Sequence, residues 1–445
     1  MKPIDLIRSG RAGTAAALLT AMAIAAFAHF TYFRLSHDHF YPDSFTYMTP
    51  ARFMLRGMGF VSDEDVAETL RTPGYPLLLA GAFHAGLGAR GIVAMQHALS
   101  LALVAGLFGL TWVMTRSTFA AILAAILFGT DIVTIHYANK VLTETVFTAA
   151  LFVVMVLAYR LLRVTDEASF IAPLLGLMTG VLVLIRPLAL FYSLVLTTVF
   201  IVRVKKQRVR LATVFLVCSL VLPAGWAFRN YDRTGVFVVS SLEGTNLLMF
   251  RAAGALAMLD SGSLRQNIAR HQSELLERSR VLLRQRYQRD PDDLPHAVCA
   301  RTYGSVAASV IARHPLAYAS LVARGAGLNL FESDWQAIAV VSTAREIILH
   351  RLFDAWTVLE VLFAAAGLAR LWKRDRDGAL LLMATIGYFI IISAGGESEG
   401  RFRVPVAPQL LLATATGMEM LAHRVREFVA GSGRLGETDA VRSNA

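Results

Sequence analysis

Long apolar stretches recur along this chain, and each is close to the length that crosses the hydrocarbon layer of a membrane. Hydrophobic residues make up 56% of the 445 residues and charged residues only 17%, which is more apolar surface than a soluble core of this length buries. The sequence therefore predicts an all-α polytopic membrane protein with about ten transmembrane helices. We place them at 13–35, 92–114, 118–135, 141–163, 169–185, 187–203, 210–228, 351–371, 378–395 and 404–423.

The net charge of +11 comes largely from short turns between these stretches. Cytoplasmic turns of membrane proteins are enriched in Lys and Arg, so these turns predict the inner side of a bacterial inner membrane, with both termini cytoplasmic. The first stretch is too long and too hydrophobic for a removable signal peptide. Nucleic-acid binding would need a basic face interleaved with stacking aromatic residues on a soluble module, and the sequence has none. The basic turns contain Arg160 and Arg163, then Lys205 and Lys206, then Lys373 and Arg374.

This topology divides the chain into four predicted parts. Residues 1–228 hold seven membrane helices and a first outer loop at 36–91, and residues 229–350 form an outer, periplasmic domain. Residues 351–423 hold three more helices, and 424–445 form a cytoplasmic tail. A basic stretch at 263–289 with apolar residues at mostly helical spacing predicts a solvated helix on the outer surface.

Two local features refine this picture. In the first outer loop we expect an interfacial helix with Ser44 as its N-cap, running to Leu55 and ended by Gly57 and Gly59. The sequence Arg186-Pro187 permits either one long kinked helix or two shorter helices that meet at the outer surface. Neither Cys218 nor Cys299 has the spacing of a metal ligand, and we expect no disulfide.

Two acidic residues are candidates for chemistry because a carboxylate at or near the membrane is costly unless it is paired or faces water. Asp43, in the first outer loop, could act as a general base toward an acceptor hydroxyl, or could lie in a solvated loop or cap the following helix. Glu144, at the outer start of the fourth span, could position a hydroxyl, bind a metal, pair with a cation such as Arg71, or only favour its helix N-terminus.

Five arginines lie at the outer ends of spans, against the usual inward bias of positive charge. A guanidinium binds phosphate oxygens through two parallel hydrogen bonds and neutralises a phosphate as it leaves. Each could instead be an anchor that extends its charged end to the membrane surface. The five are Arg71, Arg186, Arg229, Arg401 and Arg403.

The order of several short motifs resembles the GT-C superfamily of membrane glycosyltransferases, over residues from about 30 to 420. The branch that it most resembles is the bacterial one grouped with protein O-mannosyltransferases and the lipid A aminoarabinose transferase. These motifs are the acidic loop around Asp43, Arg71-Thr72-Pro73-Gly74-Tyr75-Pro76, Leu142-Thr143-Glu144, Ile185-Arg186-Pro187, Trp226 to Tyr231 with Gly244 to Leu247, and Arg401-Phe402-Arg403-Val404-Pro405.

The resemblance implies a catalytic Asp in the first outer loop, at Asp43 rather than Asp38. It implies a cationic contact to the donor phosphate, where this chain has Arg71 in place of the usual Lys, and an acidic residue at Glu144. It further implies a polyprenyl-phosphate sugar as donor and a reaction on the periplasmic side. No paired-acid motif of the metal-dependent oligosaccharyltransferase type stands beside Asp43, so we expect no required divalent metal.

The prediction is a glycosyltransferase that moves one sugar from polyprenyl phosphate to a hydroxyl of an envelope glycan, lipid or protein. Further phosphate contacts are expected from Arg186, Arg229 and Arg403, and additional site residues are Tyr75, Lys140, His136, Glu399 and Arg401. One alternative is a polymerase or ligase that moves a whole lipid-linked glycan. Another is a lipid-sugar transporter, which typically has repeated halves and broken helices with polar residues at mid-membrane, and the sequence indicates neither.

Overall fold

The computed structural model describes residues 11–63, 66–164, 167–339 and 346–442, and its regular structure is almost entirely helical. The described residues contain one small sheet, an antiparallel pair of β1 (Val61–Asp63) and β2 (Val66–Ala67) in the first outer loop. The predicted all-α membrane fold is therefore confirmed, with this hairpin as a minor addition.

Each apolar stretch predicted to span the membrane falls on one or two helices. Among the described residues, six helices are long and apolar enough to cross a membrane, or up to eight if each of two bent pairs is one span. One bent pair lies within 296–339, in the predicted outer domain, and the total of ten stays a prediction. The helices are α1 (Arg11–Leu35), α4 (Ala89–Thr115), α5 (Thr118–Gly129), α6 (Ile132–Ala138), α7 (Glu144–Arg163), α8 (Ala168–Ile185), α9 (Tyr192–Arg203), α10 (Arg208–Thr234), α17 (Glu346–Arg374), α18 (Arg376–Ile392) and α19 (Ala407–Arg442).

The span predicted at 118–135 is broken rather than continuous, and the expectation of no broken helix was wrong. Helices α5 and α6 meet at an angle of 52°. Asp131 stands at the break and caps α6, since its carboxylate accepts a hydrogen bond from the Thr134 N–H at 2.9 Å. At Arg186-Pro187 the chain forms two helices: α8 ends at Ile185, the short turn η1 (Pro187–Ala189) follows, and α9 begins at Tyr192.

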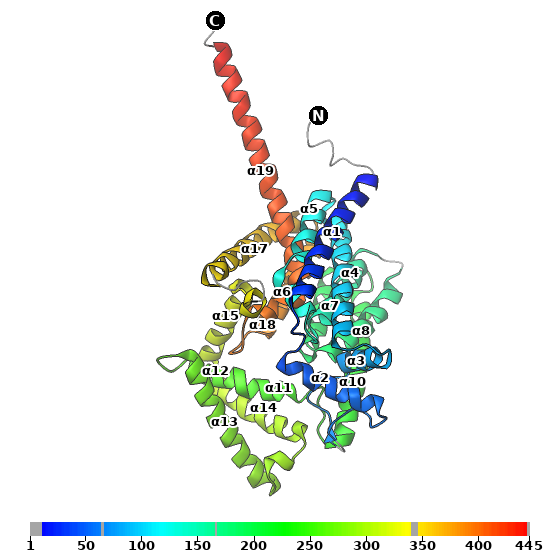
Figure 1. The fold of residues 1–445 in the computed structure, drawn as a ribbon, viewed down its shortest axis with the longest axis vertical. Helices are drawn as coiled ribbons and strands as arrows, with labels where there is room; N and C mark the ends of the chain where they lie inside the picture. The colour runs from blue at the N-terminus through cyan, green and yellow to red at the C-terminus, as the bar shows by residue number, and fades with distance from the viewer. Residues whose placement is uncertain (1–10, 64–65, 165–166, 340–345, 443–445) are drawn as a thin grey trace.

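The turns predicted to be cytoplasmic lie against one another. Arg163 at the end of α7 pairs with Asp375, and Arg203 at the end of α9 pairs with Asp377 at 2.5 Å. Asp375 also caps α18 through the Gly378 N–H at 2.9 Å. Helix α1 begins and α19 ends at this same end of the molecule (Figure 1). Helix α19 continues to Arg442, so residues 424–442 of the predicted tail are helical, and 443–445 lie outside the described residues.

At the opposite end, two helices follow α1 in the first outer loop (Figure 1). Helix α2 (Pro42–Leu55) begins three residues earlier than predicted, because Pro42 suits the first helical position and Tyr41, instead of Ser44, is the N-cap. Ser44 accepts a hydrogen bond from the Tyr41 N–H at 2.9 Å instead of capping the helix itself. Gly57 and Gly59 follow the helix at φ 76° and 82°, as its predicted end requires. Helix α3 (Gly74–His84), which the sequence analysis did not identify, packs under α2.

Residues 242–313 form a helical layer below the bundle in Figure 1, with a small core around Leu248, Leu275 and Val306. The predicted outer domain at 229–350 also takes in the end of α10 and the start of α17, its bounds stay a prediction, and 340–345 lie outside the described residues. The predicted solvated helix at 263–289 is confirmed as α13, of which only Ile268, Leu275, Ser279 and Leu283 are buried. The elements of this segment are α11 (Leu242–Asn246), the π-helix η2 (Leu247–Ala252), α12 (Ala253–Ala257), α13 (Leu264–Tyr287), η3 (Pro291–Asp293), α14 (His296–Arg313), α15 (Pro315–Phe331) and α16 (Trp335–Ala339). The turn η4 (Gly400–Val406) joins α18 to α19.

A close contact between α8 and α10 yields a test of the packing. A Cβ added at Gly176 would lie 2.6 Å from the Phe215 carbonyl oxygen, whereas one at Gly225 on α10 would meet nothing within 4 Å. We expect Gly176→Ala to lower the free energy of unfolding by about 1–3 kcal/mol because the helices must separate.

The matched Gly225→Ala variant should be neutral or slightly stabilising, since alanine favours a helix. Thermal unfolding of the two purified variants in one detergent measures the difference. Equal melting temperatures would contradict the packing of α8 on α10.

Candidate active site

One face of α2 holds the guanidinium of Arg71. Asp43, Thr46 and Tyr47 stand three and four positions apart, which places them together on a helix. The Arg71 Nη2 lies 2.8 Å from Asp43 Oδ1, its Nε donates to the Thr46 hydroxyl at 2.9 Å, and its Nη1 donates to the Tyr47 hydroxyl at 2.9 Å. Arg71 is buried, whereas the Asp43 side chain remains 40% exposed. Asp43 is thus oriented by one cation yet open to an incoming group.

A second cluster forms around Glu144, which is completely buried at the start of α7. Its Oε1 accepts a hydrogen bond from Nε of Arg401 at 2.6 Å, and it lies 2.6 Å from Nη2 of Arg401 and 3.4 Å from Nη1 of Arg186. Its Oε2 has no hydrogen-bond partner among the residues that the structure describes. The cations beside Glu144 are therefore Arg401 and Arg186, and the suggested pair with Arg71 was wrong.

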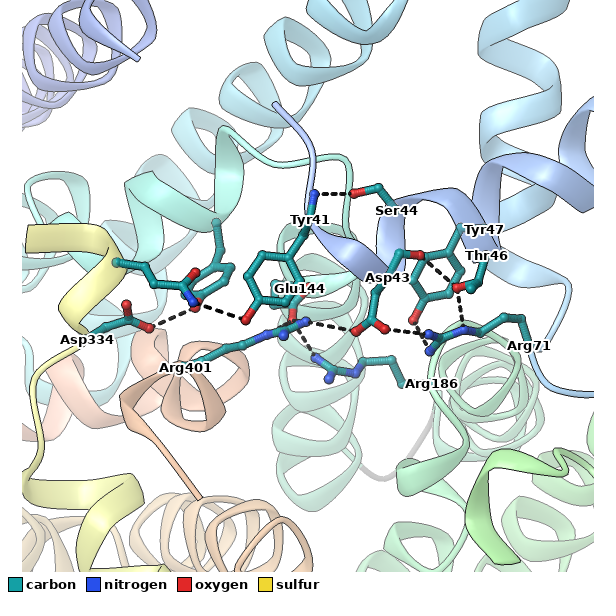
Figure 2. Close-up of polar contacts among 12 residues, drawn as sticks. Tyr41, Asp43, Ser44, Thr46, Tyr47, Arg71, Glu144, Arg186, Asp334 and Arg401 are labelled. Carbon is teal, nitrogen blue, oxygen red and sulfur yellow. Dashed lines mark hydrogen bonds and ion pairs between the residues drawn. The ribbon is translucent and has the colours of Figure 1, made fainter. Parts of the chain in front are cut away.

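Arg401 joins the two clusters, as Figure 2 shows. Its Nη2 lies 3.7 Å from Asp43 Oδ2, on the side of the carboxylate away from Arg71. The guanidinium also lies 4.7 Å from the centre of the Tyr41 ring and 5.3 Å from that of Tyr137. Such contacts attract a cation to the ring face and restrict its orientation.

Both rings are supported by the segment that leaves the outer domain. The Tyr137 hydroxyl donates to Asp334 Oδ2 at 2.8 Å, and Asp334 is itself buried (Figure 2). The Tyr41 hydroxyl accepts from the Gln336 amide at 3.3 Å. The placement of Arg401 thus depends on residues from α2, α6, α7 and the segment around α16.

Asp43, Arg71, Arg186 and Arg401 line a cavity of about 980 Å³ between the bundle and the predicted outer domain, and Glu144 is not part of this lining. Its charged lining includes Asp43, Arg71, Arg186 and Arg401 on one side, and Glu243, Arg251, Glu397 and Glu399 contributed by the outer domain and the loop before η4. Apolar lining residues are Ile185, Leu188, Phe191, Leu242, Leu247, Phe250, Val322, Ile391 and Ile392. The cavity is large enough for a sugar with its phosphate and offers an apolar wall beside them.

The other predicted site residues lie outside this cavity lining. Arg229 donates to the backbone carbonyls of Glu68 and Phe60, at 2.7 and 2.5 Å, and so holds the loop that carries Arg71. Arg403 donates to the Glu332 carbonyl at 2.8 Å. The phosphate contacts expected of Arg229 and Arg403 receive no support from these positions and stay predictions.

Three further predicted site residues make contacts with neighbouring side chains instead of lining the cavity. Lys140 pairs with Asp38 at 2.6 Å, and the Tyr75 hydroxyl donates to Gln96 at 2.7 Å while its ring packs edge-on against Tyr47. His136 shares a 2.6 Å hydrogen bond with the Tyr32 hydroxyl. They lie around the cavity and do not line it.

Two carboxylates on the outer side of the cavity have perturbed protonation. Burial raises the pKa of Glu399 to about 6, with nearby carboxylates adding to the effect and Arg401 opposing it. Glu243 keeps some access to solvent, yet the surrounding protein displaces enough water to raise its pKa to about 7. Among the described residues, no group of three or more His, Cys, Asp or Glu side chains is arranged to hold a metal ion.

Several residues in or around the candidate site were missed by the sequence analysis. Thr46 and Tyr47 follow Asp43 at helical spacing, and a helix start at Pro42 would have identified them. Asp334 and Glu243 lie in the segment 229–350, where no local pattern distinguishes them from other surface acids. Arg251 lies in a π-helix, a rare form that is frequent at functional sites but has no simple sequence signal.

No family model matches the chain, and no curated protein does. Solved structures do match. One is the oligosaccharyltransferase of Archaeoglobus fulgidus tethered with an acceptor peptide, at 13% identity and a TM-score of 0.54, over 94% of this chain and 50% of that one. Its apo form matches at 12% identity and a TM-score of 0.53, over 95% and 52%.

The structure of ArnT from Cupriavidus metallidurans bound to undecaprenyl phosphate matches at 14% identity and a TM-score of 0.40, over 89% of this chain and 77% of that one. The chain spans about half the length of the oligosaccharyltransferase that it matches. At these identities the likeness concerns the fold alone. The fold of this chain is similar to that of the archaeal oligosaccharyltransferase.

Proposed function

We propose that this protein is a glycosyltransferase that moves a monosaccharide from a polyprenyl-phosphate donor to a hydroxyl group of an envelope glycan, lipid or protein. The observation that carries the proposal is the convergence of Asp43 with Arg71, Arg186 and Arg401 at one wall of a large cavity. The motif order gives the bacterial branch, and a fold shared with an oligosaccharyltransferase supports the general reaction class.

The three guanidiniums would bind the phosphate of the donor. Arg71, Arg186 and Arg401 line the same wall, and each presents donors fixed by neighbouring side chains or carboxylates. When the bond between the anomeric carbon and the phosphate oxygen breaks, negative charge grows on that oxygen. Cations already oriented toward it stabilise this charge with little reorganisation.

Asp43 would act as the general base, and its two oxygens are not equivalent. Oδ1 is engaged by Arg71 at 2.8 Å, whereas Oδ2 is 3.7 Å from Arg401 and is the freer of the two. Oδ2 would take the proton of the acceptor hydroxyl as its oxygen attacks the anomeric carbon. The new glycosidic bond forms, polyprenyl phosphate leaves, and direct attack inverts the anomeric carbon.

Glu144 would position the arginines rather than react. It has no exposed surface, and its Oε1 is shared between Arg401 and Arg186. We further propose that the reaction requires no divalent metal, that the cavity faces the periplasm, and that the outer domain completes the acceptor site.

The base assignment predicts that Asp43→Asn lowers the rate of sugar transfer by about 100- to 10,000-fold, because the amide cannot accept the hydroxyl proton. Transfer from polyprenyl-phosphate sugars by purified protein measures this rate. Asp38→Asn is the matched control, since Asp38 pairs with Lys140 outside the cavity, and it should stay within about threefold of wild type. Full activity of Asp43→Asn would refute the assignment, and lost activity only in Asp38→Asn would transfer the role to Asp38.

Binding of undecaprenyl phosphate tests the phosphate site. We expect Arg71→Gln to weaken binding by about tenfold or more, because a charge-assisted contact is lost from a mostly dry wall. Arg278→Gln removes an equal charge from the exposed surface of α13, outside the cavity lining, and should change the affinity by less than about threefold. Equal weakening in both variants would indicate general electrostatic attraction instead of a site.

Because Glu144 holds the arginines in this proposal, replacing it should strongly lower the free energy of unfolding. Glu144→Ala leaves two cations near each other without their buried anion, which should lower the free energy of unfolding by about 3–5 kcal/mol. Glu167→Ala breaks an ion pair with Arg160 in which both side chains are more than half exposed, and should cost less than about 1 kcal/mol. Unfolding of both variants in the same detergent measures the contrast, and similar costs would contradict the role.

A further inference from the structure

The cavity lining includes two carboxylates that the proposed reaction does not use. Glu243, in the first turn of α11, and Glu399, just before η4, both line the cavity. Among the described residues, neither side chain has a hydrogen bond or an ion pair, whereas the nearby Glu397 is paired with Arg251 at 3.2 Å. Two carboxylates without protein partners in one cavity are available to a ligand.

Glu243 and Glu399 lie near the arginines that we propose to bind the phosphate. Ser240 and Ser241, just before Glu243, hydrogen-bond the Leu70 and Thr69 carbonyls at 2.6 and 2.8 Å, which places α11 beside the strand of chain that carries Arg71. Glu399 is two residues from Arg401, and the two are close enough for Arg401 to oppose the rise in its pKa. Glu243 therefore lies near the segment that carries Arg71, and Glu399 lies near Arg401.

The cavity lining therefore carries free carboxylates close to the guanidiniums. A phosphate held by the arginines carries its substituent away from them, into the space that Glu243 and Glu399 also line. Carboxylates accept hydrogen bonds from hydroxyl groups strongly, and in a partly dry cavity such bonds are worth more than in water. At pH 8, above the pKa values of about 7 for Glu243 and about 6 for Glu399, both side chains are ionised, so a carboxylate on the ligand would meet like charge at both positions, and the test is made at this pH.

We propose that Glu243 and Glu399 bind the hydroxyl groups of a sugar next to the phosphate and select against sugars that carry an acid group. The inference rests on the proposed function, because the phosphate fixes where the sugar lies. It assigns the two residues to specificity, separate from the transfer step at Asp43. The sugar is either that of the donor lipid or that of a sugar-bearing acceptor.

The test compares three lipids by competition binding to the purified full chain: undecaprenyl phosphate, its glucosyl derivative and its glucuronyl derivative. The two glycosyl lipids differ only in a hydroxymethyl group against a carboxylate. We expect wild type to bind the glucosyl lipid at least about tenfold more tightly than the glucuronyl lipid. A tenfold ratio in affinity corresponds to about the free energy of one hydrogen bond. The Glu243→Gln/Glu399→Gln double variant should reduce this ratio to about threefold or less, with binding of undecaprenyl phosphate unchanged.

Methyl glucoside and methyl glucuronide, added with undecaprenyl phosphate bound, distinguish the two sources of the sugar. If wild type binds the two glycosides with different affinity and the double variant does not, the carboxylates bind the sugar of the acceptor. If that difference is instead found between the two glycosyl lipids, they bind the sugar of the donor. If wild type discriminates in neither pair, or the double variant keeps the wild-type ratio, the inference is overturned. Failure of wild type to bind undecaprenyl phosphate would instead reject the proposed function itself.

Discussion

The site depends on the ion pairs that the buried carboxylate of Glu144 makes with two arginines. A charge without solvent is stable only when oppositely charged partners surround it, and Glu144 has Arg401 at 2.6 Å and Arg186 at 3.4 Å. This requirement brings together the start of α7, the end of α8 and the turn η4. Once Arg401 is held there, its remaining surface faces Asp43, and the first outer loop is joined to the other end of the sequence.

The architecture of the cavity follows from that junction. Asp43 comes from α2, which packs on α3, and Arg71 comes from the loop between them. The outer domain reaches the same place through α11 and through the segment around Asp334. The groups that we propose to react therefore lie where the bundle and the predicted outer domain meet, a usual position for a ligand site.

Much of the fold could be predicted from the sequence because membrane helices are encoded by long apolar stretches that need no tertiary information. Helix breaks were harder: Asp131 within an apolar stretch is a capping residue whose role appears only when α5 and α6 bend apart. The start of α2 was misplaced by three residues because Ser44 is a good N-cap by type, while Pro42 fixes the helix earlier.

The site was predictable where charge opposes the rule for membrane turns, as at Arg71, Arg186 and Arg401. The same signal selected Arg229 and Arg403, whose partners are backbone carbonyls, because residue type does not reveal which partner a guanidinium finds. Glu243 and Asp334 gave no signal, since their roles come from contacts between segments far apart in the chain.

The separation of these partners along the chain has a consequence for biosynthesis. Arg401 lies 257 residues beyond Glu144, so α7 is made long before its main counterion. Arg186 arrives much earlier, at the end of the next helix, and is the first cation able to neutralise Glu144 as the spans assemble. The cluster around Glu144 is therefore complete only after the turn η4 has been made, long after Asp43 and Arg71 have been synthesised and can pair.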